Sequence, residues 1–187
     1  MRAALFAVTA SLVLVACGGP QTSQANNVQA NMSNTASPPA TAAASPAPAP
    51  SFAPVSGDQA KQVMHERHEG MESIGKTTKA LKRQLDSASP DMAAVSAGAA
   101  QIQDLSGKAT GWFHAGTGPD VGKTGAKPEI WQNQQDFAAK LRGFQEAAKA
   151  FNAAAMSGDA PSIKTKFGEL GQSCKACHDK YRSEMHH

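Results

Sequence analysis

Three features of the sequence predict an all-α protein, an antiparallel four-helix bundle. Apolar residues recur every three or four positions along four stretches after Asp58, which is the spacing of one helix face. Proline, glycine and capping residues separate these stretches, and none alternates apolar and polar residues as a half-buried strand does. The folded part, residues 58–187, has about 130 residues, enough for a single core. Two of its three connections are short, so neighbouring helices should run antiparallel.

The first helix is expected from Asp58 to Leu85, with Ser56 or Asp58 as its cap. Its inward stripe is Val63, Arg67, Met71, Ile74, Thr78, Leu81 and Leu85. The second helix is expected to start at Ser89-Pro90-Asp91, with Ser89 as cap and Pro90 in the first turn, and to run to about Phe113. Its inward stripe is Met92, Val95, Ala99, Ile102, Leu105 and Ala109.

A glycine-rich loop from His114 to Lys127 should follow, and Pro128 should open the third helix, which Ser157-Gly158 ends. Its inward stripe is Ile130, Phe137, Leu141, Phe144, Ala148, Phe151 and Ala155. The fourth helix is expected to start at Asp159 and Pro161 and to run to near Glu184.

The fourth helix contains the string Cys174-Lys175-Ala176-Cys177-His178, which has the CxxCH spacing of a c-type haem attachment site. Two thiols at this spacing add across the two vinyl groups of haem, and the adjacent imidazole reaches the iron. Both cysteines and the histidine share one helix face, which continues the apolar stripe Ile163, Phe167 and Leu170. We therefore expect one covalent haem c on the buried face of the C-terminal helix.

Other uses of a CxxC pair fit less well. A thioredoxin-like oxidoreductase places it after a strand, and no strand precedes Cys174. A structural zinc site needs a second pair of ligands, and no matched pair occurs. A bundle used only for protein interaction would leave CxxCH on the core face unexplained. No nucleophile, base and orienting acid stand at workable spacing, so we do not expect an enzyme.

The N-terminus resembles a bacterial lipoprotein signal. Residues 1–16 contain one positive charge, Arg2, and then an apolar run too short for a retained membrane span. The run ends in Leu14-Val15-Ala16-Cys17, which resembles the lipobox, so Cys17 is expected to carry the lipid. Ordinary cleavage that leaves Cys17 unmodified is the alternative. Lipid on Cys17 and haem on the other two cysteines would leave none for a disulfide.

Residues 17–57 are expected to form a disordered tether. From Gly18 to Gly57 there is no charged residue, and Ala, Pro, Ser, Asn and Thr dominate. A flexible coil of this length reaches about 35 Å. The chain has 18 Lys and Arg against 15 Asp and Glu, without a basic block, so nucleic acid is not an expected partner.

Several strings together resemble the class II cytochromes c, the cytochrome c′ family, over most of the stretch from Asp58 to Arg182. The attachment string runs into Asp179 and Tyr181-Arg182. The long loop contains Gly116-Thr117-Gly118 and then Lys127-Pro128-Glu129-Ile130-Trp131. In the first helix, Arg67 is followed by Met71 and Ile74-Gly75.

The resemblance implies haem c held by Cys174 and Cys177, with His178 as the proximal iron ligand. It also implies Arg67 near a haem propionate, Arg182 beside the proximal histidine, and Met71 on the distal side. Spacing agrees independently for Arg182, which follows His178 by four residues and so shares its helix side. His68, three residues before Met71, could compete for the iron, although a solvated helix edge is the simpler interpretation.

Two functions follow from the identity of the sixth ligand. A thioether sulfur can bind iron, and His/Met ligation suits electron transfer because it raises the reduction potential. The main expectation is therefore an electron-transfer protein with His178 and Met71 on the iron. The alternative is a five-coordinate haem that binds nitric oxide or carbon monoxide on the Met71 side. Expected partners are redox proteins and a membrane reached only through the lipid, on the periplasmic side of the bacterial envelope. The resemblance also allows a homodimer.

Overall fold

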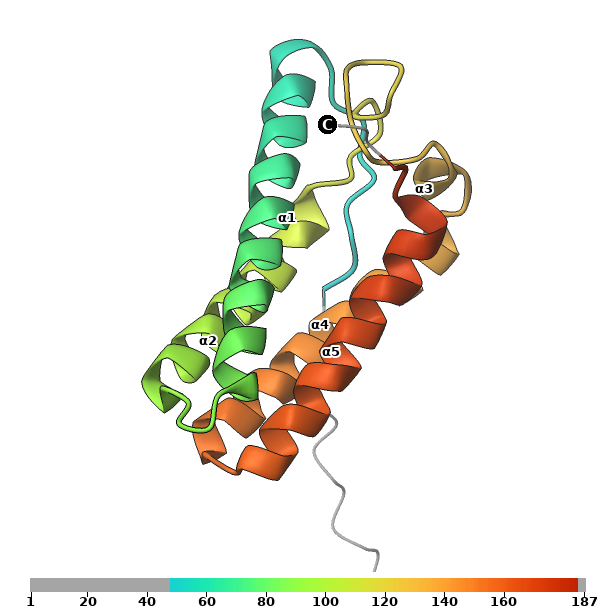
Figure 1. Ribbon diagram of the computed structural model, residues 1–187. Helices are drawn as coiled ribbons and strands as arrows, with labels where there is room; N and C mark the ends of the chain where they lie inside the picture. Colours follow the sequence, from blue (N-terminus) through green and yellow to red (C-terminus); the bar gives the residue numbers. More distant parts are fainter. Residues whose placement is uncertain (1–47, 185–187) are drawn as a thin grey trace, which may run out of the picture. The chain divides into compact units, whose positions relative to one another are not determined.

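The computed structural model describes residues 48–184 of the chain. Four long antiparallel helices make up most of this part (Figure 1). They are α1 Gly57–Asp86, α2 Met92–Lys108, α4 Gln134–Ser157 and α5 Ala160–Tyr181. A 3-10 turn, η1 Ala109–Gly111, extends α2, and the short helix α3 Glu129–Gln132 precedes α4. Residues 48–184 contain no β-strand, only two isolated β-bridges. The predicted all-α bundle is confirmed.

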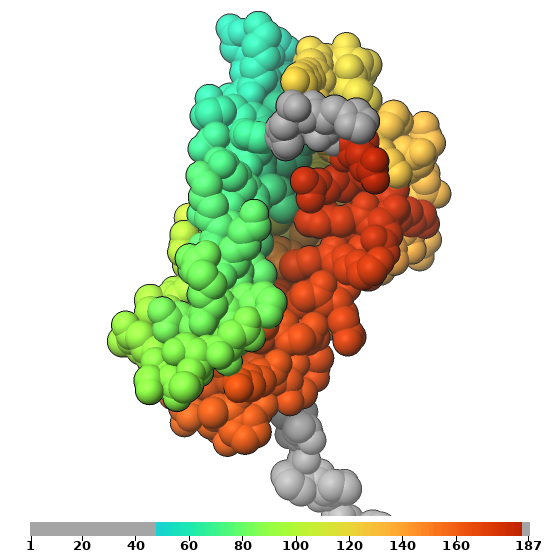
Figure 2. Space-filling model, viewed as in Figure 1, coloured from blue at the N-terminus to red at the C-terminus, as the bar shows by residue number. Residues whose placement is uncertain are grey.

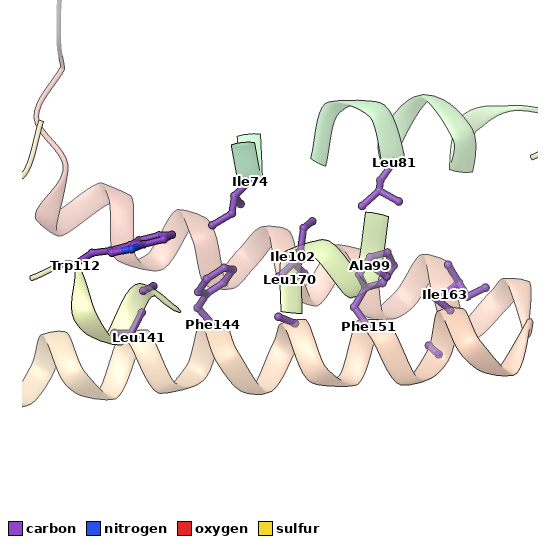
Figure 3. Packing of buried hydrophobic residues seen from close by; sticks show 14 of the residues in the cluster. Ile74, Leu81, Ala99, Ile102, Trp112, Leu141, Phe144, Phe151, Ile163 and Leu170 are labelled. Atoms are coloured by element: carbon purple, nitrogen blue, oxygen red, sulfur yellow. The ribbon is translucent and has the colours of Figure 1, made fainter. Parts of the chain in front are cut away.

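The predicted stripes supply most of the core. Figure 3 shows these side chains pointing toward one another from α1, α2, α4 and α5. Fully or almost fully buried stripe residues include Leu81, Val95, Ala99, Ile102, Phe137, Ala148, Phe151, Ile163 and Leu170. Burying one large apolar side chain contributes about 1.5–3 kcal/mol. The repeated burial of such residues is therefore what holds the four helices together.

Side chains and glycine define several helix ends. The Asp159 carboxylate accepts a hydrogen bond from Ser162 N (3.0 Å) at the start of α5, as predicted. Gly158, in the left-handed conformation (φ 73°), ends α4. The N-cap of α2 is Asp91, whose carboxylate accepts from Ala93 N and Ala94 N. The prediction of Ser89 as this cap was therefore wrong by two residues, and Pro90 precedes the helix.

Two other predicted helix ends and the continuity of the third helix differ from the structure. Regular α-helix ends at Lys108 rather than near Phe113, because the chain tightens into η1. The third predicted helix is interrupted at Asn133 (φ −122°, ψ 49°), whose side-chain amide donates to Glu129 O and competes with helical bonding. Helix α5 ends at Tyr181 rather than near Glu184, because Arg182 turns into an extended conformation and bridges to Ala126.

The bundle is closed on three sides and open on the fourth. Helix α1 packs along α2, α2 along α4 and α4 along α5, whereas α1 and α5 barely touch. Figure 2 shows a recess between α1 and the C-terminal half of α5. Near the other end of the same seam, a cavity of about 240 Å³ is lined by Lys82, Leu85, Asp86, Lys164 and Phe167. The α1/α5 seam is thus the side that can admit a bulky group.

The N-terminal predictions concern residues that the structure mostly does not describe. The signal peptide, Cys17 and the tether up to residue 47 lie outside the described residues. The tether was expected to extend to residue 57, but Ser51 N and Val55 N donate hydrogen bonds to the bundle. The end of the predicted tether is therefore docked. No helix within residues 48–184 is long and apolar enough to cross a membrane.

Candidate haem site

Helix α5 presents the CxxCH string at the open seam. The side chains of Cys174 and Cys177 are half-buried against the core, and both cysteines are free. His178, the next residue, is exposed in the last turn of α5. The two thiols stand one helical turn apart. This arrangement suits two thioether bonds to one flat group lying along the helix.

The surrounding protein shifts the pKa values of these side chains. It raises the pKa of the Cys177 thiol to about 11 and also raises the pKa of Cys174. Redox-active cysteine pairs instead depend on a lowered thiol pKa, so the structure opposes the thioredoxin-like alternative. Partial burial, followed by the charge of Arg182, lowers the pKa of His178. A lowered pKa favours the neutral imidazole, the form that binds a metal.

The glycine-rich loop anchors the end of α5. Lys127 N donates to Tyr181 O (3.0 Å), and Ser183 N donates to Gly125 O (2.9 Å). Arg182 N donates to His178 O (3.0 Å), so Arg182 directly follows the turn that carries the histidine. These bonds fix the turn of helix that presents His178.

A tyrosine and a lysine tie the same turn to α4. The buried Tyr181 donates its hydroxyl hydrogen to Asp136 Oδ2 (2.5 Å), and Lys180 Nζ lies 2.9 Å from the same oxygen. Both bonds lower the pKa of Asp136. The Tyr181 ring also stands edge-on to Phe137, with 5.2 Å between ring centroids. Sequence periodicity placed Phe137 in the core but did not reveal this polar bond.

Arg67 is buried on α1 and bound to the loop. Its Nη1 donates to Trp112 O and Thr117 Oγ1, both at 3.0 Å. Its Nη2 donates to Thr117 O (2.8 Å) and Thr124 Oγ1 (2.9 Å). Its guanidinium carbon also lies 5.5 Å from the centroid of the Phe113 ring. Burial lowers the pKa of Arg67 to about 10, so the side chain stays charged at neutral pH.

The sequence predicted a haem propionate as the partner that the Arg67 charge requires. In the structure protein oxygens satisfy both Nη nitrogens, while Nε has no acceptor among residues 48–184. The Nε nitrogen of Arg67 therefore remains to donate to a haem propionate, and this contact stays a prediction. Thr117 and Thr124 were missed as site residues, because no spacing rule connects a helix to a loop some fifty residues away.

Two tryptophans, Trp112 and Trp131, hold the segment after α2 in place. A Cβ at Gly70 would lie 2.2 Å from the ring of Trp112, so only glycine permits this contact. Trp131 Nε1 donates to Phe113 O (3.1 Å) and His114 O (3.0 Å). The loop is therefore held on α1 by Trp112 and at α3 by Trp131. Trp112 and Gly70 were not singled out from the sequence, which shows no signal of their contact.

Met71 lies half-buried against the core, as do Cys174 and Cys177. Gly75 is one turn from Met71 on the same face, and Gly171 is three residues from Cys174 on α5. A Cβ at either glycine would meet nothing within 4 Å. Neither glycine therefore obstructs the faces that carry the thioether and the thiols, and the lowered histidine pKa and the paired thiols fit a haem.

His68, three residues before Met71 on α1, lies at the exposed edge of the helix. It is exposed, and its ring can approach the carboxylates of Glu69 and Glu72, which are exposed as well. Glu72 also pairs with Lys76 at 2.9 Å. His68 is therefore part of a solvated helix edge, the simpler of the two interpretations of the sequence.

Comparisons with known proteins agree with this site. The family model "Cytochrome C′" matches residues 62–182. A cytochrome c′ from Allochromatium vinosum is 34% identical over 137 residues, which cover 72% of this chain and 88% of the relative. The solved cytochrome c′ from Thermochromatium tepidum is 30% identical with a TM-score of 0.63, over 71% of this chain and all of the other.

Two further solved relatives show what the family can bind and form. A variant of cytochrome c prime from Alcaligenes xylosoxidans was solved as a nitric oxide complex; it is 32% identical, with a TM-score of 0.53, over 68% of this chain and 96% of that one. Another cytochrome c′ shows ligand-controlled dimer dissociation; it is 31% identical, with a TM-score of 0.62, over 69% of this chain and all of the other. The chain described here belongs to the cytochrome c′ family, whose members bind haem c covalently, and it is therefore a haem c protein.

Proposed function

We propose that the protein transfers electrons through a haem c attached to Cys174 and Cys177, with His178 and Met71 as the iron ligands. The observation that carries this proposal is the position of Met71, half-buried against the core on α1, as Cys174 and Cys177 are on α5. Met71 offers a thioether, a soft ligand that iron accepts. The protein acts as a carrier and not as a catalyst.

The surrounding residues would set the properties of the site. When bound, the haem supplies a one-electron couple at its iron. His178 offers a nitrogen whose pKa is lowered, first by the surrounding protein atoms and then by the charge of Arg182, which favours the neutral form. The buried aromatic rings of Phe113, Phe137 and Tyr181 exclude water at this end of the bundle. A dry cavity and a methionine ligand both favour the reduced, less charged iron and so raise the reduction potential.

The alternative function is gas binding at a five-coordinate iron. The nitric oxide complex of a relative that is 32% identical favours it. In this case Met71 would line the distal pocket without binding the iron, and nitric oxide or carbon monoxide would enter between α1 and α5. The two functions use the same attachment residues and differ only in the role of the Met71 sulfur.

Visible absorption spectra of the holoprotein, oxidised and reduced, with and without carbon monoxide, separate the two functions. Low-spin spectra that carbon monoxide does not change would support the electron carrier. High-spin spectra that shift when carbon monoxide is added would support gas binding and contradict ligation by Met71. Absence of haem bands after expression with the haem-attachment machinery would contradict both functions.

The proposed location is the periplasmic side of the bacterial envelope, with the protein held to a membrane by lipid on Cys17 and reaching its redox partners on the tether. Mass spectrometry of the mature N-terminus tests this. A diacylglycerol adduct on Cys17 that disappears in Cys17→Ser is expected, and an unmodified Cys17 would contradict anchoring.

A homodimer is proposed through the outer face of α1 and α2. A groove of about 610 Å³ runs there beside Glu66, Glu69, Leu105, Lys108 and Trp112. Ligand-controlled dimer dissociation in a relative supports the proposal. Sedimentation of the holoprotein should give the mass of a dimer, and Leu105→Glu should convert it to a monomer. A monomeric wild type would contradict it.

A further inference from the structure

The segment before α1 is bound along the bundle. Ser51 N donates to Thr110 O, and Val55 N donates to Ala115 O, both at 2.9 Å. His114 Nδ1 donates to Ala53 O at 2.9 Å. We call residues 50–55 the strap. Its hydrogen bonds connect it to η1 and to the start of the glycine-rich loop, so it is held at both ends.

The loop has a seat for the strap. Gly116 adopts φ +83°, a conformation that favours glycine, and a Cβ there would lie 2.3 Å from Val55 O. Pro54 also forms an isolated parallel bridge with Ala115. Because a side chain at position 116 would push against the strap backbone, the glycine both shapes the loop and admits the strap.

Phe52 brings the strap into contact with a group of packed aromatic rings at the haem end of the bundle, which we call the aromatic layer. Its half-buried ring packs against the core and lies edge-on to Phe137, with 6.2 Å between centroids. Phe137 in turn contacts Phe113 at 4.6 Å and Tyr181 at 5.2 Å. Tyr181 follows Cys177 by one turn of α5. The layer therefore extends from the strap to the turn that carries the haem motif.

The strap runs between α1 and α5 in the view of Figure 1, and its contacts with η1 and α4 place it on the inner side of that seam. Its ring joins Met71, Cys174 and Cys177 among the half-buried apolar groups around the core. The strap precedes residues 62–182, the part that the family model matches.

We propose that the strap is a wall of the haem cavity, with Phe52 as the side chain that shields the haem from water. The inference rests on haem at the α1/α5 seam and does not depend on ligation by Met71. Since the strap continues directly into the predicted tether, it also fixes the point from which the tether leaves the domain. Release of the strap would open the cavity on the side of η1 and α4.

Two measurements on the full-length holoprotein test the proposal. Hydrogen exchange followed by mass spectrometry reports strap docking, because the amides of Ser51 and Val55 are protected by their hydrogen bonds. Perturbation of the haem absorption bands by ethylene glycol reports haem exposure, whatever the sixth ligand is. The variants are Phe52→Ala and Gly116→Ala, with Met156→Ala as control, since Met156 is 76% exposed near the α4/α5 turn.

Phe52→Ala should speed exchange of the strap amides by on the order of tenfold. Loss of the ring's packing free energy raises the population of the undocked strap, from which the amides exchange. Gly116→Ala should do the same through the loop. In both variants the solvent perturbation of the haem bands should increase, and Met156→Ala should leave both readouts unchanged.

Faster exchange with unchanged haem exposure would overturn the proposal, because the strap would then be docked away from the haem. Unchanged exchange in both variants would overturn it as well. A high-spin spectrum of the wild type would contradict only the ligation of iron by Met71. Failure of the ligation proposal can therefore be told apart from failure of the strap proposal.

Discussion

The two ends of the bundle are built in different ways. At the end near the α4/α5 turn, aliphatic and aromatic stripe residues fill the core between the helices, with Leu81, Val95, Phe151 and Ile163 almost fully buried. At the other end, the core includes a charged Arg67 and its threonine partners, and a long loop supplies much of the contact. Regular packing stabilises the first end, whereas the second end surrounds the site.

Glycine permits a close approach at both ends, with different neighbours. A Cβ at Gly98 of α2 would lie 2.9 Å from Leu81 of α1, so two helices meet there. At Gly70 the neighbour is the ring of Trp112, from the segment after α2. The end near the α4/α5 turn is therefore held by the periodic apolar residues of the helices, whereas the haem end needs contacts between residues distant in sequence.

The largest expected effect is at the end near the α4/α5 turn. Phe151 is completely buried and its ring lies 5.4 Å from that of Phe167. Phe151→Ala should reduce the free energy of unfolding by about 4 kcal/mol because it leaves a cavity. Urea titration of the holoprotein measures this, with Met156→Ala as the exposed control. A loss no larger than that of the control would show that the end near the α4/α5 turn does not stabilise the bundle.

Arg67→Met should have the next largest effect and act at the haem end. The change keeps the length of the side chain but leaves the carbonyls of Trp112 and Thr117 without their donor, which should cost about 3 kcal/mol. Urea titration should show the loss, and hydrogen exchange should localise it to residues 112–124. Arg83→Met, an exposed position of the same helix, is the control. Equal effects of the two variants would contradict the role of the buried guanidinium.

Gly70→Ala should cost about 2 kcal/mol, because the new methyl group overlaps the Trp112 ring and the core cannot easily expand. Tryptophan fluorescence should shift as Trp112 moves. Gly143→Ala is the matched control, since a Cβ at this α4 glycine would meet nothing within 4 Å. An unchanged fluorescence spectrum in Gly70→Ala would show that Trp112 does not need this contact.

The smallest effect concerns pH. The bonds from Tyr181 and Lys180 lower the pKa of Asp136 below its ordinary 3.8. The contribution of Asp136 to stability is therefore fully present above pH 3.8 and is lost as the pH falls through its lower, folded value. Asp136→Asn should be less stable than the wild type at neutral pH, and the difference should shrink in that acid range. Asp104→Asn is the control, and a difference that does not vary with pH would contradict the assignment.

The sequence was sufficient to predict the helices and the CxxCH face, because the 3.6-residue period records burial on one side. It could not reveal the partners of Arg67, since Thr117 and Thr124 lie in a loop without periodicity. Helix ends were misplaced where side chains such as Asn133 compete for backbone bonds. Composition predicts a free tether up to residue 57, but the apolar Phe52 and Val55 allow its end to dock on the bundle.

Whether the open seam holds a six-coordinate iron is decided most directly by comparing two methionine variants. Resonance Raman spectra of the ferric and ferrous holoprotein should be measured for wild type, Met71→Ala and Met92→Ala, since Met92 is also half-buried but lies on α2. If Met71 binds the iron, the wild type and Met92→Ala should show low-spin, six-coordinate marker bands, and Met71→Ala should show five-coordinate bands. Identical coordination in all three proteins would contradict ligation by Met71.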